Sequence, residues 1–279
     1  MDGWSEVDSR DYILPLEILN IRDVPADFCL PAEWTRFEAG LFLPRDRPDW
    51  FGRSAYPARI LLLSRDKLFA LPHPSTREGP AVCGLKEISF VESGQMLLRG
   101  WMSFRASKFD CTTPYNRCGY RPVCRFMRRF RVAWLPDRSV RTEPPIEFGD
   151  TLDCKFKYAL AEELDPAERS VAGFFQAPRE VRVKKFCFSQ LRWDAGDLIA
   201  LTPRRVLWIT DRDSSGYARY GTIARSAPIS AVRSIQLISV TEPPSLEVAF
   251  EAGPSWIVPL RAENLESVGE FVRMAYIGV

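Results

Sequence analysis

The sequence predicts a mainly β protein built from two similar domains, each closed by an amphipathic helix at its C-terminal end. The length of 279 residues favours two domains, because single hydrophobic cores rarely grow beyond about 250 residues. A strand–turn–strand pattern occurs in both halves, and each half ends in apolar residues spaced three and four apart. The composition, 46% hydrophobic and 27% charged, is typical of packed globular proteins, so each half should have its own core.

The strand–turn–strand pattern is an internal repeat. Residues 63–71 align with residues 201–209, and each segment has an apolar strand end, a polar turn and a second apolar strand. Residues 85–91 and 229–235 then carry apolar side chains at matching offsets. Two further strands across a tight turn follow in each half, at residues 95–104 and at residues 245–260. Trp208 and Trp256 fall on apolar strand positions of the second half and are predicted to be buried.

An amphipathic helix is predicted at the end of each half. Its apolar positions in the first half are Val123, Phe126, Met127, Phe130, Ala133 and Trp134. In the second half they are Leu265, Val268, Phe271, Val272 and Ala275. Prolines at 136, 144 and 145 break helix, which marks the linker between the halves. The predicted boundaries are an N-terminal extension 1–39, a first domain 40–136, a linker 137–154 and a second domain 155–279.

The second half resembles a known family. The segments "TPRR", "VLWIT", "PISAVRSI" and "LEVAFEAGPSWIVPL" followed by a helix are similar to the pleckstrin-homology-like domains of many bacterial proteins. The entry "EELDPAERSVAGFF" resembles their Leu-x-Pro-Gly-Glu opening, with Ala167 where glycine is usual. The resemblance covers residues 155–279 and, more loosely, 40–136. It implies two tandem split antiparallel barrels, each with one open corner plugged by the C-terminal helix, but no particular function, because the fold hosts several.

No motif in the sequence indicates catalysis, a cofactor or a metal. The single histidine, His73, lies between two prolines without a G-x-S-x-G element, so we expect an ordinary loop histidine. Glycine-rich phosphate loops are absent from the sequence. Cys111, Cys118 and Cys124 lack the paired spacing of a zinc site, and Asp211 and Asp213 lack the rest of a calcium loop. The prediction is a protein that is not an enzyme.

Charge, apolar runs and cysteine content indicate the compartment and argue against a nucleic-acid partner. A net charge of +2 is too small to indicate nucleic-acid binding. The acidic N-terminus lacks the features of a secretory signal, and no apolar run is long enough to span a bilayer. Seven scattered cysteines suit reduced thiols. These features predict a cytoplasmic protein without a transmembrane segment.

Two basic clusters are the candidate contacts for an anion or a partner. The first, on the helix of the first half, comprises Arg121, Arg125, Arg128, Arg129 and Arg131. These arginines are predicted to face away from the apolar stripe, with no acid among them, so they could meet an anionic membrane or an acidic partner. The alternative, which we favour, is a solvated arginine face on a core helix.

The second basic cluster lies on the predicted first strand of the second domain. It comprises Arg179, Arg182, Lys184 and Lys185. The family resemblance implies that headgroup phosphates are held near this hairpin in lipid-binding members. The acidic turn 193–197 that follows would repel phosphate, which weakens the lipid interpretation.

Two functions remain open. The leading hypothesis is a non-catalytic interaction module that presents a sheet edge or the groove between its domains to a protein partner or to its own copy. The alternative is peripheral binding of anionic phospholipid headgroups through the basic clusters.

Overall fold

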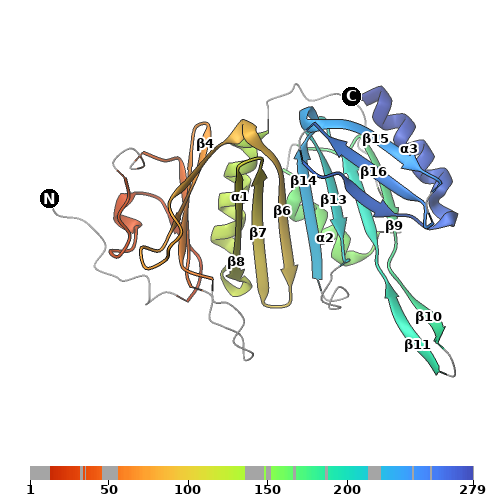
Figure 1. The fold of residues 1–279 in the computed structure, drawn as a ribbon, viewed down its shortest axis with the longest axis horizontal. Helices are drawn as coiled ribbons and strands as arrows, with labels where there is room; N and C mark the ends of the chain where they lie inside the picture. The colour runs from red at the N-terminus through yellow and green to blue at the C-terminus, as the bar shows by residue number, and fades with distance from the viewer. Residues whose placement is uncertain are drawn as a thin grey trace. The chain divides into compact units, whose positions relative to one another are not determined.

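The protein is mainly β, with antiparallel sheets and a C-terminal helix, as the sequence predicts (Figure 1). The computed structural model describes residues 13–31, 34, 36–45, 56–135, 148, 152–165, 168–185, 188–212, 221–240, 242–251 and 253–278. The chain divides into two compact units. Unit 1 comprises Met1–Ile88 and Leu97–Pro136, and unit 2 comprises Ser89–Met96 and Asp137–Val279. A short strand segment from the first half of the sequence therefore belongs to unit 2.

Unit 1 contains a five-stranded antiparallel sheet, a hairpin and a helix. The sheet is formed, in this order, by β1 (Leu16–Ile18), β2 (Ala39–Leu43), β3 (Arg59–Ser64), β4 (Lys67–Pro72) and β5 (Ala81–Gly84). The hairpin of β7 (Arg99–Ala106) and β8 (Phe109–Asn116) leads into α1 (Tyr120–Trp134). Gly40 lets β1 approach β2, because a Cβ at this position would lie only 2.8 Å from the Cβ of Ile18.

The helix α1 buries the predicted apolar stripe against unit 1. Val123, Phe126, Met127, Phe130 and Trp134 are all buried, and α1 contacts β1 and β2. The indole Nε1 of Trp134 donates a hydrogen bond to the carbonyl oxygen of Ile88 (3.1 Å). Phe28 and Trp34, from the predicted N-terminal extension, are buried in the same unit.

Among the described residues, unit 2 has two main antiparallel sheets, a separate two-stranded hairpin and two helices. Its larger sheet follows the order β6 (Ile88–Met96, of which Ser89–Met96 belongs to unit 2), β14 (Gly221–Pro228), β13 (Arg205–Thr210), β12 (Asp197–Leu201) and β9 (Ala172–Gln176). The smaller sheet contains β15 (Val232–Ile238), β16 (Ser245–Phe250) and β17 (Trp256–Pro259). The helices are α2 (Cys154–Glu163) and α3 (Leu265–Gly278).

Unit 2 buries two apolar layers. Residues of both sheets and of α3 form the main core, where Trp208 and Trp256 are each only 4% exposed, as predicted. The helix α2 packs on β13 and β14 with Phe156 in a second, smaller core. Because this layer also includes Leu198 and Ile209, β12 and β13 are buried along their whole length.

Corresponding backbone contacts occur in the two units. The predicted hairpins 63–71 and 201–209 form β3–β4 and β12–β13. In unit 1 a 3-10 turn (Leu85–Glu87) follows β5, and the amide of Leu85 donates to the carbonyl of Asp66 in the hairpin turn (2.7 Å). In unit 2 the turn is Ile229–Ala231, and the amide of Ile229 donates to the carbonyl of Arg204 (2.9 Å).

The basic segment 179–185 is not the first strand of the domain sheet, in contrast to our prediction. It forms β10 (Arg179–Lys185), which pairs with β11 (Phe188–Asp194) in a two-stranded hairpin. The strand that joins the sheet is β9, which precedes it. The alternating pattern of the segment predicts a strand correctly but does not specify its partner. In Figure 1 this hairpin extends away from the other strands of unit 2.

The described part of the chain contains the three α-helices α1, α2 and α3. None of its helices is long and apolar enough to cross a bilayer. No disulfide joins the described cysteines Cys29, Cys83, Cys111, Cys118, Cys124 and Cys154. Among the same described residues, no group of three His, Cys, Asp or Glu side chains could hold a metal ion.

Candidate functional site: a basic arm on unit 2

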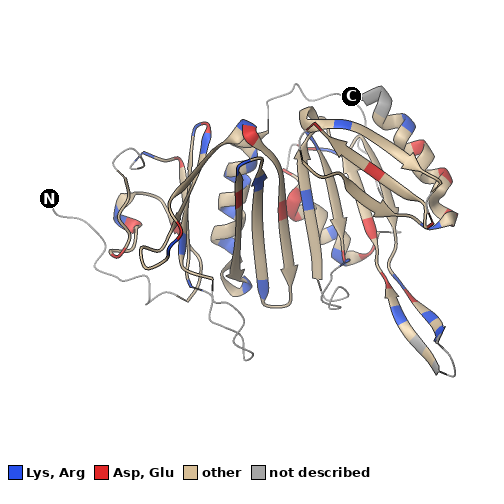
Figure 2. Ribbon diagram, viewed as in Figure 1, with Lys and Arg blue, Asp and Glu red and all other residues tan. Residues whose placement is uncertain are grey.

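The hairpin β10–β11, which we call the arm (Arg179–Asp194), carries the whole second predicted basic cluster. Arg182, Lys184 and Arg192 are exposed on it, and Lys185 is the last residue of β10 (Figure 2). Between Val181 and Arg192 the sequence contains no acidic residue. The acids of the hairpin, Glu180 and Asp194, lie at its base, so the distal part of the arm carries only positive charge.

The register of the arm places its distal cations opposite neutral residues. Arg182 lies opposite Leu191, Lys184 opposite Ser189, and Arg192 opposite Val181. Residues directly opposite each other in an antiparallel pair project from the same face. The side chains of Val183 and Leu191 are 40% and 60% exposed, so both strands combine cations with accessible apolar surface. An isolated two-stranded hairpin is at best marginally stable in water, which makes its attachment important.

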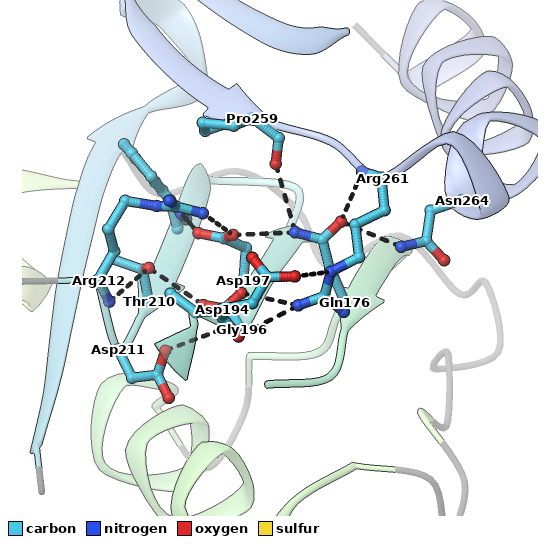
Figure 3. A network of polar contacts seen from close by, with 12 residues as sticks. Gln176, Asp194, Gly196, Asp197, Thr210, Asp211, Arg212, Pro259, Arg261 and Asn264 are labelled. Carbon is cyan, nitrogen blue, oxygen red and sulfur yellow. Dashed lines mark hydrogen bonds and ion pairs between the residues drawn. The ribbon is translucent and has the colours of Figure 1, made fainter. Parts of the chain in front are cut away.

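The attachment is a dense set of hydrogen bonds at the base of the arm (Figure 3). The carboxylate of Asp194, at the end of β11, accepts from Arg179 Nε (3.1 Å) and from Arg261 Nε (2.8 Å). Arg261 also donates to the carbonyl oxygens of Ala177, Asp194 and Ala195 at 2.6 to 3.2 Å. A single side chain next to α3 thus fixes both ends of the arm.

The next residue of this network, Asp197, is fully buried. Its carboxylate accepts from Trp208 Nε1 (3.0 Å), Gln176 Nε2 (3.2 Å) and an Arg212 terminal nitrogen (3.2 Å). Burial raises the pKa of Asp197, while Arg212 and the hydrogen bonds from Trp208 and Thr210 act in the opposite direction. Gln176 Oε1 in turn accepts from the amide of Arg261 and from Asn264 Nδ2, both at 3.0 Å. The network therefore joins the sheet, the arm and the start of α3.

The acidic turn 193–197 is not the repulsive surface that the sequence predicts. Asp194 is bound by two arginines, and Asp197 is paired inside the protein with Arg212. Nearby, Asp211 accepts from the Gly196 amide (2.7 Å) and from Trp193 Nε1 (3.2 Å), and it pairs with Lys155. The acidic groups thus hold the arm in place. Because they are paired with cations, the expected repulsion of an anionic ligand by this turn no longer applies.

The arginines of α1 are engaged to different degrees. Arg125 lies 3.1 Å and Arg129 3.7 Å from the carboxylate of Glu17 on β1. Arg121 and Arg128 are exposed. The prediction that all five arginines face away from the apolar stripe is wrong for Arg131, which is 6% exposed. Arg131 lies four residues after Met127 and three before Trp134, so helix geometry places it beside the stripe.

His73 has partners that the sequence did not suggest. Its Nε2 lies 2.8 Å from Asp27 Oδ2 and its Nδ1 lies 2.7 Å from Ser75 Oγ. Ser75 follows two residues later and could have been considered from the sequence. Asp27 is distant in the sequence and precedes the first predicted domain, so no local signal pointed to it.

A second buried polar cluster of unit 2 is centred on Arg205, which is fully buried. Its Nε and one terminal nitrogen donate to the two carboxylate oxygens of Glu168, at 2.9 and 2.6 Å. It also donates to the Glu163 carbonyl (2.5 Å) and to Ser226 Oγ (3.2 Å). Because protein groups occupy this guanidinium, the cluster stabilises the hairpin β12–β13 and is no ligand site.

The Glu168 carboxylate should make the stability of unit 2 depend on pH. Burial alone would raise its pKa, but the hydrogen bonds and charge of Arg205 prevail and hold it below the usual glutamate value of 4.5. A lowered folded-state pKa stabilises the fold above about pH 4.5, and this contribution is lost as the pH falls through the lower folded value. We expect wild type to lose more stability than Glu168→Gln between neutral pH and about pH 3.5 in urea titrations. An equal loss in both proteins would contradict this assignment.

Comparisons with known proteins do not assign a function to this chain. No model of a known protein family matches the chain, and a search of curated proteins finds no significant match.

Proposed function

We propose that this chain is a non-catalytic interaction module that binds an acidic segment of a partner protein through the arm. The observation that carries the proposal is the distal arm, where Arg182, Lys184 and Arg192 are exposed without an acid between them. We further propose that the two units are pleckstrin-homology-like domains. The corresponding hairpin and 3-10 contacts of the two units and the helix that follows each set of strands support this relationship.

The arm combines main-chain and charge recognition. In the described part of the chain, β10 and β11 pair only with each other, so each strand presents an edge to which an extended peptide could add. Acidic side chains of such a peptide would neutralise the arm cations, and apolar side chains would cover Val183 and Leu191. Pairing between two copies of the arm is less favourable, because it brings like charges together.

The anchoring network supports a binding role for the arm. Arg261 and Asp194 hold its base through several charged hydrogen bonds. A hairpin fixed in this way loses less conformational freedom when it binds, which favours affinity. The distal cations Arg182, Lys184 and Arg192, by contrast, are exposed, so they remain available to a partner.

Charge reversal on the arm tests the proposal. We expect the triple variant Arg182→Glu, Lys184→Glu, Arg192→Glu to bind a synthetic alternating Glu-Val peptide roughly tenfold more weakly, or worse, in fluorescence anisotropy. The wild-type affinity should fall as salt is raised, because exposed charges are screened. Stability should change by less than about 0.5 kcal/mol per substitution, since these side chains are exposed.

A matched variant controls for net charge. Arg77→Glu, Lys86→Glu, Arg233→Glu changes the charge of the chain equally at exposed positions outside the arm. It should bind the peptide like wild type. Equal loss of binding in both triple variants would refute the arm as the contact, as would equal affinity for a Gln-Val peptide.

The exposed apolar residues of the arm support a second candidate, the anionic phospholipid surface. Val183 and Leu191 lie beside cations, a combination suited to the boundary of a membrane. Co-sedimentation with phosphatidylcholine vesicles, with and without phosphatidylserine, distinguishes the two functions. Arm-dependent binding to the anionic vesicles without binding to the acidic peptide would favour the lipid function.

A further inference from the structure

The surroundings of His73 form a chain of three side chains in unit 1. Asp27 Oδ2 contacts Nε2 of the imidazole at 2.8 Å, and Ser75 Oγ contacts Nδ1 at 2.7 Å. The side chains of His73 and Asp27 are 22% and 21% exposed, whereas Ser75 is exposed. A partly buried carboxylate, a partly buried imidazole and an accessible hydroxyl therefore follow one another.

The loop holds the imidazole in one orientation. The amide of His73 donates to the Ala58 carbonyl (2.9 Å), and the amide and hydroxyl of Thr76 both donate to the His73 carbonyl (2.9 Å each). The ring of Phe28 packs edge-on against the imidazole, with ring centroids 5.3 Å apart. Pro72 and Pro74 further restrict the backbone on either side. Little reorganisation is then needed for a proton to move along the chain.

The hydrogen bonds also determine the tautomer. The amide of Ser75 donates to Nδ1 (3.1 Å), so this nitrogen carries the lone pair. The ring proton is then on Nε2 and is donated to Asp27. The hydroxyl of Ser75, 2.7 Å from the same lone pair, must donate its own proton to Nδ1.

We propose that Ser75 is a nucleophilic hydroxyl, with His73 as its general base and Asp27 as the positioning carboxylate, that accepts an acyl group from an ester. In this step Ser75 Oγ bonds to the acyl carbon and passes its proton to His73 Nδ1. The ester C–O bond breaks, and the leaving alkoxide takes that proton from Nδ1 and departs as the alcohol. Asp27 stabilises the transient imidazolium.

The nearest backbone donors limit the reaction to a single acylation. The Ser75 amide is bound to Nδ1 and the Thr76 amide to the His73 carbonyl, so neither is directed at an oxyanion on the acyl group. Loss of one such donor slows acyl transfer by about 100- to 1000-fold in hydrolases. Acylation of Ser75 and hydrolysis of acyl-Ser75 both lack this stabilisation, so turnover is slow and Ser75 is a site of stoichiometric acylation.

Labelling with a fluorophosphonate tests the proposal on the whole chain. The Ser75 oxygen bonds to phosphorus, fluoride leaves, and the hydroxyl proton passes to His73. Peptide mapping by mass spectrometry should show Ser75 labelled at least about 100-fold faster than Ser189, an exposed serine of the arm, because the single histidine of the chain lies beside Ser75. Labelling of the two serines at equal rates would overturn the proposal.

Two variants separate a chemical role from a structural one. In His73→Asn the side-chain oxygen can still accept from the Ser75 amide, so the loop is retained without a base. Its labelling of Ser75 should fall to the Ser189 rate while its melting temperature stays near that of wild type. Asp27→Asn keeps an acceptor for Nε2–H but loses its charge, and labelling should slow by about tenfold. Wild-type labelling in His73→Asn would exclude the imidazole as the base.

Discussion

Replacing Arg205 with methionine should lower the free energy of unfolding of unit 2 by about 3 to 5 kcal/mol. The guanidinium is fully buried and donates to both oxygens of Glu168, whose side chain is only 2% exposed. Without it, the Glu168 carboxylate would remain in the interior and keep the hydrogen bond from the Thr202 hydroxyl (2.8 Å), but it would lose its positively charged partner. The uncompensated charge dominates the cost, because methionine fills a similar volume.

The neighbouring arginine provides a matched control. Arg204 pairs with Asp165 at 3.6 Å, and its side chain is 21% exposed. Arg204→Met should therefore cost less than about 1 kcal/mol. Urea denaturation followed by circular dichroism measures both variants, and equal costs would show that the burial of the Arg205 pair has no special importance.

A second substitution separates the charge from the packing. In Arg205→Met, Glu168→Leu both charges are removed, so much of the lost stability should return. If the double variant is as unstable as the sum of the single variants, the two side chains do not act as a pair.

The elements that the sequence predicted correctly are those determined by local residues. The hairpins β3–β4 and β12–β13 follow from polar turns such as Pro203-Arg204 between apolar runs, and α1 follows from the spacing of Phe126, Phe130 and Trp134. Strand partners are not local. The pattern of residues 179–185 predicts a strand, but it cannot show that this strand joins β11 rather than the domain sheet.

In the candidate site, too, the local features could be predicted from the sequence and the contacts between distant residues could not. The cations of the arm are visible in the sequence because they are adjacent and no acid separates them. The pairing of Asp194 with Arg261 and that of Asp27 with His73 join residues far apart in the chain, and each carboxylate has several sequence-compatible partners. The burial of Arg131 could not be predicted either, because the exposure of a helix position at the border of an apolar stripe depends on what packs beside it.

Trp256→Ala should be the most damaging single truncation in the main core of unit 2, with a cost of about 3 to 5 kcal/mol. The indole is 4% exposed and contacts three aromatic rings, those of Phe250, Trp208 and Phe90, at centroid distances of 4.8 to 6.1 Å. These rings come from β16, β13 and β6, so the cavity would open between the two sheets.

Two further substitutions, one at a neighbouring residue and one conservative, test whether the lost stability comes from the cavity. Ile257, the next residue along β17, is 47% exposed, and Ile257→Ala should change the free energy of unfolding by less than about 1 kcal/mol. Trp256→Phe should cost less than Trp256→Ala, because it leaves a smaller void and removes an indole Nε1 that has no hydrogen-bond partner. Thermal melting of the three variants gives the order directly. If Trp256→Ala melts within a degree or two of Ile257→Ala, Trp256 does not fill the space between the sheets, and the register of β17 against β16 is incorrect.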